Sequence, residues 1–156
     1  MKRKILILFA FVFLISFPGF AAQTSESDDS QKLVALVDKA AALIEKKGKE
    51  AFPDLRKKDS EWFQGEQYVF VDSMEGTVLV NPPNPAIEGE NLIKNAAAKK
   101  LFDGMLEVVK AKDSGWTEYM WPKPGESTPS KKKSYIRKVK MPDGTMVIVG
   151  SGMYIQ

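Results

Sequence analysis

The residues with the clearest chemical potential lie in one stretch, YMWPKPGESTPSKKKSY, from Tyr119 to Tyr135. Residues two apart on a β-strand share a face, so Tyr119 and Trp121 would project together. A proline-rich loop follows, and then the run Lys131–Lys133. An ammonium group at the mouth of a pocket can pair with an anionic ligand, and lysine suits a compact carboxylate as a point charge. Phenol and indole groups would add hydrogen-bond donors to such a site.

Each of these features also has a plainer interpretation. Paired aromatic residues on one strand face are more often part of a core, and a run of charges is usually a solvated edge. Strand alternation places Lys133, and not Lys132, on the face of Tyr135. Spacing alone therefore leaves open which lysine faces a pocket, and whether there is a pocket.

The composition argues against the common catalytic sites. The chain contains no cysteine and no histidine, which excludes a thiolate nucleophile, a Ser-His pair and an imidazole metal ligand. Carboxylates remain, and the acids nearest to the stretch are Asp103, Glu107, Asp113 and Glu118. No pair among them has an obvious catalytic spacing, because acids four apart on a helix commonly form a solvated face. We therefore predict no enzyme, no metal site and no cofactor.

The N-terminal segment has the three parts of a secretory signal peptide. The basic residues Lys2–Lys4 precede the apolar run Ile5–Phe17, and small residues follow. This run is shorter than the ~18–20 residues of a membrane-spanning helix, which makes a retained anchor the alternative. We predict a signal peptide over residues 1–22, cleaved near Ala21 or Ala22, and a periplasmic or secreted protein.

Removing this segment changes the charge balance of the chain. Three of the 23 Lys and Arg residues lie in it, which leaves 20 basic residues against 20 acidic ones. The mature chain then has no net charge, and we expect no nucleic-acid partner because a global basic field is absent. Its length is typical of a single domain.

The hydrophobic pattern predicts an α+β domain over residues 31–156. Apolar residues spaced by three and four indicate a long helix from Gln31 towards Gly48, preceded by a short disordered leader over residues 23–30. Alternating segments indicate strands over residues 67–73, 77–81, 115–121, 133–141 and 145–155, with a helix over residues 91–110. Five short strands without regular βαβ alternation favour an antiparallel sheet with helices on one side.

Three segments taken in order, YVFVDSMEGTVLVNP, GWTEYMWPKPGESTPSKKKSYI and IVGSGMY, resemble the single Cache domain of bacterial extracytoplasmic sensors. The resemblance covers most of residues 33–154. It implies a PAS-like fold, in which a long N-terminal helix accompanies a five-stranded antiparallel sheet that cups a small organic ligand, often a short carboxylate. Carried over by position, the ligand-binding residues would be Tyr119, Trp121, Lys132 and Tyr135, with Tyr68 and Asn81 as further candidates; Lys132 would pair with the carboxylate.

The sequence departs from the family pattern in three places. Asn81 stands where many members have histidine, and Thr145 and Val147 stand where many have tryptophan. Membrane-bound members continue from the final tyrosine into a transmembrane helix, whereas this sequence stops at Gln156. We therefore expect a sensor that signals through a separate membrane receptor, kinase or transporter. The alternative is a protein-interaction or structural module whose cavity is filled by its own side chains. Whether the domain forms a homodimer is left open.

Overall fold

The computed structural model describes residues 20–155, so most of the predicted signal peptide lies outside the described residues. The helical elements are α1 (Phe20–Lys47), η1 (Gly48–Ala51), α2 (Phe52–Leu55), η2 (Pro85–Ile87), η3 (Leu92–Lys94) and α3 (Ala96–Lys112). The strands are β1 (Phe63–Gln64), β2 (Gln67–Ser73), β3 (Val78–Val80), β4 (Ser114–Pro122), β5 (Pro129–Lys140) and β6 (Met146–Tyr154). Within the described residues, none of the helices combines the length and the apolar character needed to cross a membrane.

The helix α1 is longer than the sequence predicts. It begins at Phe20, so residues 23–30, which we expected to form a disordered leader, are helical. Neither glycine nor proline occurs between Phe20 and Lys47, and these are the residues that interrupt a helix most strongly. The helix ends at Gly48, whose φ of +59° is a left-handed conformation that glycine adopts without strain.

The strands form one antiparallel sheet in the order β1-β2-β6-β5-β4, and β3 also pairs with β2. The predicted antiparallel α+β fold is confirmed, with the two-residue strand β1 as an addition. The strand β5 begins at Pro129, so part of the predicted proline-rich loop belongs to the sheet. Two long hairpins, β4–β5 and β5–β6, share the strand β5. The centre of β5 is therefore paired with β4 on one side and with β6 on the other.

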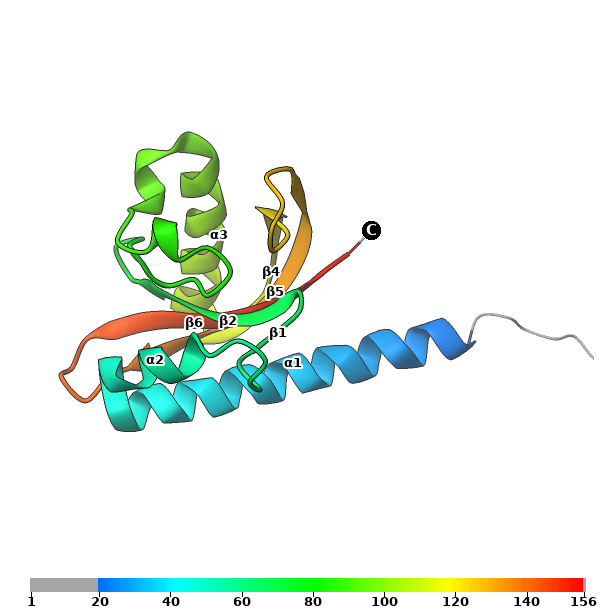
Figure 1. Cartoon of the computed structure of the whole chain (residues 1–156), viewed down its shortest axis with the longest axis horizontal. Coiled ribbons are helices and arrows are strands. Elements are labelled where there is room, and N and C mark those ends of the chain that lie inside the picture. The colour runs from blue at the N-terminus through cyan, green and yellow to red at the C-terminus, as the bar shows by residue number, and fades with distance from the viewer. Residues whose placement is uncertain (1–19, 156) are drawn as a thin grey trace, which may run out of the picture.

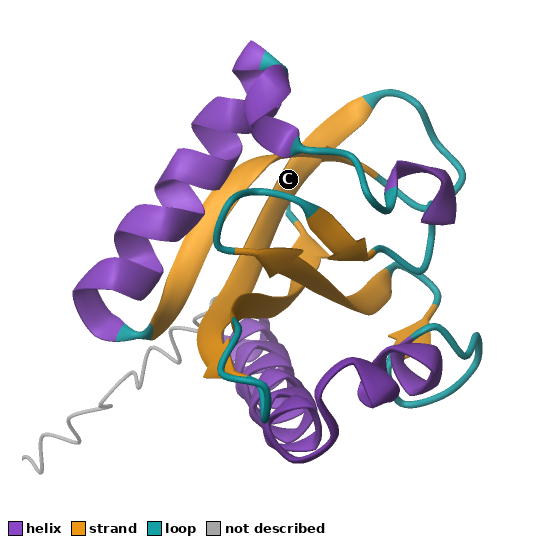
Figure 2. Ribbon diagram, turned by 90° about the vertical axis from the view of Figure 1, so that its left-hand side faces the viewer, coloured by secondary structure: helices purple, strands orange, loops and turns teal. Residues whose placement is uncertain are grey.

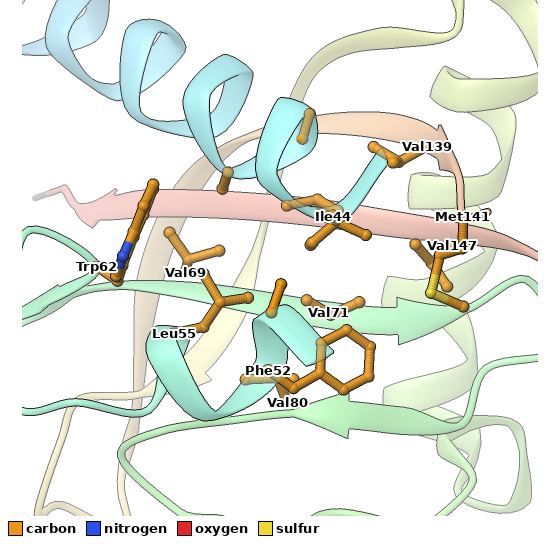
Figure 3. Packing of buried hydrophobic residues seen from close by; sticks show 14 residues of the cluster. Ile44, Phe52, Leu55, Trp62, Val69, Val71, Val80, Val139, Met141 and Val147 are labelled. Carbon is orange, nitrogen blue, oxygen red and sulfur yellow. The ribbon is translucent and has the colours of Figure 1, made fainter. Parts of the chain in front are cut away.

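One face of the sheet packs against α1 and α2 as an apolar core, and we call it the α1 face (Figure 3). The helix α1 contributes Ala40, Ala41 and Ile44, which follow the predicted spacing. The buried strand residues that meet these helices are all valines: Val69, Val71, Val80, Val139, Val147 and Val149. Because β-branched side chains pack well on a pleated surface, this face is a regular hydrophobic core.

The opposite face, which we call the α3 face, is covered by α3 and the segments that precede it. The helix α3 begins at Asn95, whose side chain accepts hydrogen bonds from the amides of Ala97 and Ala98. It packs Phe102, Met105 and Val109 against the sheet. Figures 1 and 2 show the sheet between α1 and α3, so helices lie on both faces and not on one side as the sequence predicts. The reason is that both sets of alternating strand residues are buried.

Candidate functional site

The α3 face carries a row of polar side chains across three strands. Lys132 on β5 lies directly opposite Tyr119 on β4 and Tyr154 on β6. Tyr68 and Phe70 on β2, the strand beyond β6, share this face. Phe70 pairs with Gly150 on β6 and Gly150 pairs with Ile136 on β5, and Ile136 is on the same face as Lys132 because the two are four residues apart. The antiparallel register therefore gathers residues that are up to 86 positions apart in the chain, from Tyr68 to Tyr154.

Lys132 lies at the centre of this row and is completely buried. Its Nζ atom has no hydrogen-bond partner among the described residues. It lies 3.8 Å from the centroid of the Tyr68 ring, 5.1 Å from that of Tyr154 and 5.9 Å from that of Phe70. Burial lowers the pKa of Lys132 to about 7, although the Glu66 carboxylate acts in the opposite direction. Contacts with aromatic faces stabilise the ammonium group but do not replace its lost hydrogen bonds with water.

Two glycines on β6 make room for side chains of the site, Gly152 for Lys132 and Ser134 and Gly150 for Phe70. A Cβ atom on Gly152 would lie 2.1 Å from the Oγ atom of Ser134 and 3.0 Å from the Cε atom of Lys132. A Cβ atom on Gly150 would lie 2.4 Å from the Cζ atom of Phe70. The contacts at 2.1 Å and 2.4 Å are far below van der Waals distance, so Gly152 is a structural condition for the packing of Lys132 and Ser134, and Gly150 for the packing of Phe70.

Tyr119 and Trp121 line the site from β4, as the sequence predicts. The Tyr119 hydroxyl is 2.8 Å from the Oγ atom of Ser134, and burial raises the pKa of Tyr119 above its ordinary value. The ring of Trp121 packs edge-on against Tyr119, with 6.5 Å between their centroids. Tyr154 closes this end by donating a hydrogen bond to the carbonyl of Pro122, at 2.6 Å. The aromatic wall is thus held by hydrogen bonds at both edges.

A small cavity of about 20 Å³ lies beside this row. Tyr68, Phe70, Asp72, Asn81, Tyr119 and Trp121 line it, together with the apolar residues Val78, Leu92, Leu101 and Met105. That volume holds about one water molecule. Asp72, at 5% exposure, and Asn81 supply the polar part of its lining, and burial raises the pKa of Asp72 to about 7.

The loop that carries Asn81 is fixed to the α1 side of the molecule by an ion pair. Arg56 donates from Nη2 to Glu88 at 2.6 Å and to the carbonyl of Leu79 at 3.0 Å. Glu88 in turn accepts a hydrogen bond from the amide of Asn81 at 2.8 Å. Burial raises the pKa of Glu88, but the hydrogen bonds from Arg56 and Asn81 outweigh it and hold the pKa below its ordinary value. Asn81 is therefore a well-positioned part of the cavity wall.

A larger groove of about 720 Å³ lies between the beginning of α3 and the strand β4. Leu101, Tyr119 and Trp121 line both this groove and the small cavity. These three side chains therefore lie between the small cavity and the groove.

The structure brings five of the six predicted site residues together and separates the sixth. Tyr119, Trp121, Tyr68 and Asn81 line the cavity, and Lys132 lies over the Tyr68 ring. Tyr135, three residues after Lys132, projects to the opposite face, where its hydroxyl donates to the Oγ atom of Ser114 at 3.0 Å and its ring packs edge-on against Trp116. Strand alternation is the physical reason: residues an odd number apart point to opposite faces.

Further residues of the site were not among the predicted ones. Asp72, Phe70, Ser134 and Tyr154 all contact or line it. A signal for Asp72 is present in the sequence, because alternation places it on the same face as Tyr68 and Phe70. The contributions of Ser134 and Tyr154 depend on the register between strands, which alternation within one strand does not specify.

With the fold and the site described, comparison with known proteins identifies the family. A family model described as the Cache domain matches residues 24–156, and the chain therefore belongs to the Cache domain family. It is 32% identical over 95 residues to the methyl-accepting chemotaxis protein McpP of Pseudomonas putida. That match covers 60% of this chain but 17% of McpP, so it concerns one part of a much longer protein.

Solved structures of Cache domains have the same fold. A Cache chemosensory domain described for its recognition of carboxylic acids matches with a TM-score of 0.69 and 23% identity, over 88% of this chain and 100% of that chain. The periplasmic sensor domain of a chemotaxis protein matches with a TM-score of 0.63 and 27% identity, over 88% and 99% of the two chains. The resemblance of the sequence to a Cache domain is thus confirmed.

Proposed function

We propose that this Cache domain is a sensor module that binds a short carboxylate, and that Lys132 pairs with the carboxylate group. The observation that carries the proposal is the buried ammonium group without a hydrogen bond. Buried polar groups in native proteins are nearly always hydrogen-bonded, and an exception needs an explanation. A carboxylate would supply the missing charge-assisted hydrogen bond, and a structural neighbour described for carboxylic acid recognition supports the choice of ligand.

The size of the cavity limits the ligand and the way it is bound. A cavity of about 20 Å³ must widen to hold even a two- or three-carbon acid. The aromatic wall that it shares with the groove of about 720 Å³ offers the space for this. We therefore propose that a ligand displaces the side chains of Leu101, Tyr119 or Trp121 and comes to lie across the Tyr68 ring, next to Lys132.

The test is to measure binding of acetate and propionate by calorimetry to the wild type and to Lys132→Met and Lys131→Met. Lys131 is the matched control, because it lies next to Lys132 but pairs with Glu118 at the surface, at 2.8 Å. A hydrogen bond to a charged group is worth about 1.5–3 kcal/mol, so Lys132→Met should weaken binding by at least about tenfold. Lys131→Met should leave it unchanged. Equal, small effects of both substitutions would refute the assignment of Lys132.

The alternative function, a protein-interaction module with a self-filled cavity, is favoured by one observation, the small volume of the cavity. A module of that kind does not require a completely buried lysine with no hydrogen bond, which costs about 1–3 kcal/mol of stability. If neither acid nor any other small metabolite binds the wild type, the interaction module becomes the better proposal. The groove beside β4 would then be the first surface to test with partner proteins.

We also propose that the domain binds its ligand reversibly without catalysis and acts in the periplasm or outside the cell. The family and the periplasmic sensor neighbour support this. The acids considered for catalysis are engaged in surface ion pairs in three cases: Asp103 with Lys99, Asp113 with Lys138, and Glu118 with Lys131. A signalling partner such as a membrane receptor, a kinase or a transporter remains part of the proposal.

A further inference from the structure

The buried carboxyl group of Asp72 is the second unusual charge on the α3 face. Asp72 lies on β2, two residues beyond Phe70 on the same face, and lines the small cavity. It is 5% exposed, and the structure shows no hydrogen bond or ion pair to its side chain from any residue in the described part of the chain. The lysine at the same level of the sheet is Lys138 on β5, because Asp72 and Lys138 both pair with Ile148 on β6. The ammonium group of Lys138 pairs with Asp113 and not with Asp72.

A buried carboxyl group without a partner is expensive, as is a buried ammonium group. Lys132 and Asp72 form no ion pair with each other in the described part of the chain. The Nζ atom of Lys132 lies over Tyr68 and 5.9 Å from the Phe70 ring, while Asp72 follows Phe70 along the strand by about 6–7 Å, at about 3.3 Å per residue. The order on the face is therefore ammonium, aromatic floor, carboxyl, and the aromatic floor and the carboxyl group line the cavity.

The residues around Asp72 continue this polar end of the cavity. Asn81 lies on the same wall at 5% exposure. The hydroxyl of Tyr119, which points towards Ser134, is close enough for the charge of Asp72 to contribute to the raised pKa of Tyr119, after burial, the main cause. A ligand that reaches from Lys132 across the Phe70 ring thus meets a hydrogen-bond acceptor, not an apolar wall.

We propose that Asp72 is a specificity-determining residue that selects short carboxylic acids carrying a hydroxyl or ammonium group at the end opposite to the carboxylate. This inference rests on the proposed function, because Lys132 must hold the carboxylate first. A simple carboxylate would leave Asp72 buried and without a partner, whereas a donor at the far end of the ligand would give it a hydrogen bond. Sites built to bond a polar group of the ligand discriminate strongly against analogues that lack it.

The experiment compares four acids with the same three-carbon chain: propionate, 3-hydroxypropionate, 3-aminopropionate and malonate. They differ only at the third carbon, which is a methyl group, a CH2 group with a hydroxyl, a CH2 group with an ammonium, or a second carboxylate. Calorimetry is done with the full chain as wild type, Asp72→Asn and Asp103→Asn. Asp103 is the matched control, because it is the same residue type on the outside of α3, paired with Lys99.

We expect the wild type to bind the hydroxyl or the ammonium compound at least about tenfold more tightly than propionate, the value of one hydrogen bond to a charged group. Malonate should bind more weakly than both donor compounds. Asp72→Asn should reduce the preference to about threefold or less, and Asp103→Asn should leave it intact. If Asp72→Asn does not fold, the relative affinities of the wild type for propionate and the donor compounds still test the proposal.

Each contrary result has a distinct meaning. If propionate binds as tightly as the donor compounds and its binding depends on Lys132, the role of Asp72 is refuted while the proposed function stands. Tighter binding of malonate would refute it as well, because Asp72 would then be donating a proton to the ligand and not accepting one. If none of the four acids binds the wild type, the proposed function fails and the inference fails with it.

Discussion

The two faces of the sheet are built from alternate residues of the same strands, yet they treat buried polar groups differently. On the α1 face the buried Ser151 donates a hydrogen bond from Oγ to the carbonyl of Tyr68, at 2.8 Å, and its surroundings are valines. On the α3 face the buried Nζ atom of Lys132 has no such bond, and the carboxyl group of Asp72, at 5% exposure, faces the cavity. One face is therefore arranged for stability. The other keeps unsatisfied groups beside a cavity, which is where natural proteins locate recognition.

The strongest test of this comparison is a change in each face that should have opposite effects on stability. On the α1 face, Ile44→Ala should lower the free energy of unfolding by about 2–5 kcal/mol, because it removes buried methyl groups from a packed core. Chemical denaturation measures the change. Leu43→Ala on the same helix is the control and should cost less, since Leu43 is only partly buried. Equal losses would show that the two helix positions contribute alike and that the core is not confined to the face described.

On the α3 face, Lys132→Met should raise the free energy of unfolding at neutral pH by about 1–3 kcal/mol, because it removes a buried group whose hydrogen bonds are unmade. The melting temperature of the ligand-free protein checks this. Lys131→Met should change it by less than about 0.5 kcal/mol, as expected for a surface ion pair. A loss of stability in Lys132→Met would mean that the contacts of the ammonium group with Tyr68 and Tyr154 outweigh its burial, and would weaken the contrast between the faces.

The smallest effect is the dependence of stability on pH, to which both unsatisfied groups contribute. Asp72 has a pKa of about 7 in the folded protein against 3.8 in an exposed carboxyl, so between these values the folded state holds the extra proton and stability falls as pH rises. Lys132 has a pKa of about 7 against 10.5. Between those values the unfolded state holds the extra proton, and stability rises with pH.

The combined contribution of these two groups to the free energy of unfolding should therefore be lowest near pH 7. It should be higher at about pH 5 and at about pH 9. Urea denaturation of the wild type, Asp72→Asn and Lys132→Met at the three values measures this. Asp72→Asn should remove the fall on the acid side, and Lys132→Met the rise on the alkaline side. Profiles of both variants that run parallel to the wild type would show that neither group titrates in the folded protein as its burial implies.

The sequence predicts the architecture of this protein better than its site. Residues 67–73 and 145–155 are rich in β-branched and aromatic residues, which favour strands, and the strands there are as expected. The start of α1 was missed because residues 23–30 are polar and acidic, a composition typical of disordered segments as well as of exposed helices.

Within the site, the difficulty is register. Alternation joins Lys133 with Tyr135 on one face, and the family pattern points to Lys132 on the other, but no property of a single strand tells which of the two faces meets Tyr68 and Phe70. That depends on the pairing of β5 with β6 and of β6 with β2, which is specified by contacts between distant parts of the chain. Tyr135 was included because the family pattern carried it over by position, although alternation within β5 already placed it on the face of Lys133.

The run of three lysines on β5 has a consequence for how this domain can change during evolution. Lys131 and Lys133 flank Lys132 on β5. Lys131 pairs with Glu118 at the surface, and the Nζ atom of Lys133 lies over the ring of Trp116. If one residue were inserted in or deleted from the loop between β4 and β5, and a β-bulge before Ser134 absorbed the change, another lysine would occupy the position of Lys132. A buried ammonium group would then be kept at this position of the sheet, whereas the same change beside a single lysine would remove it.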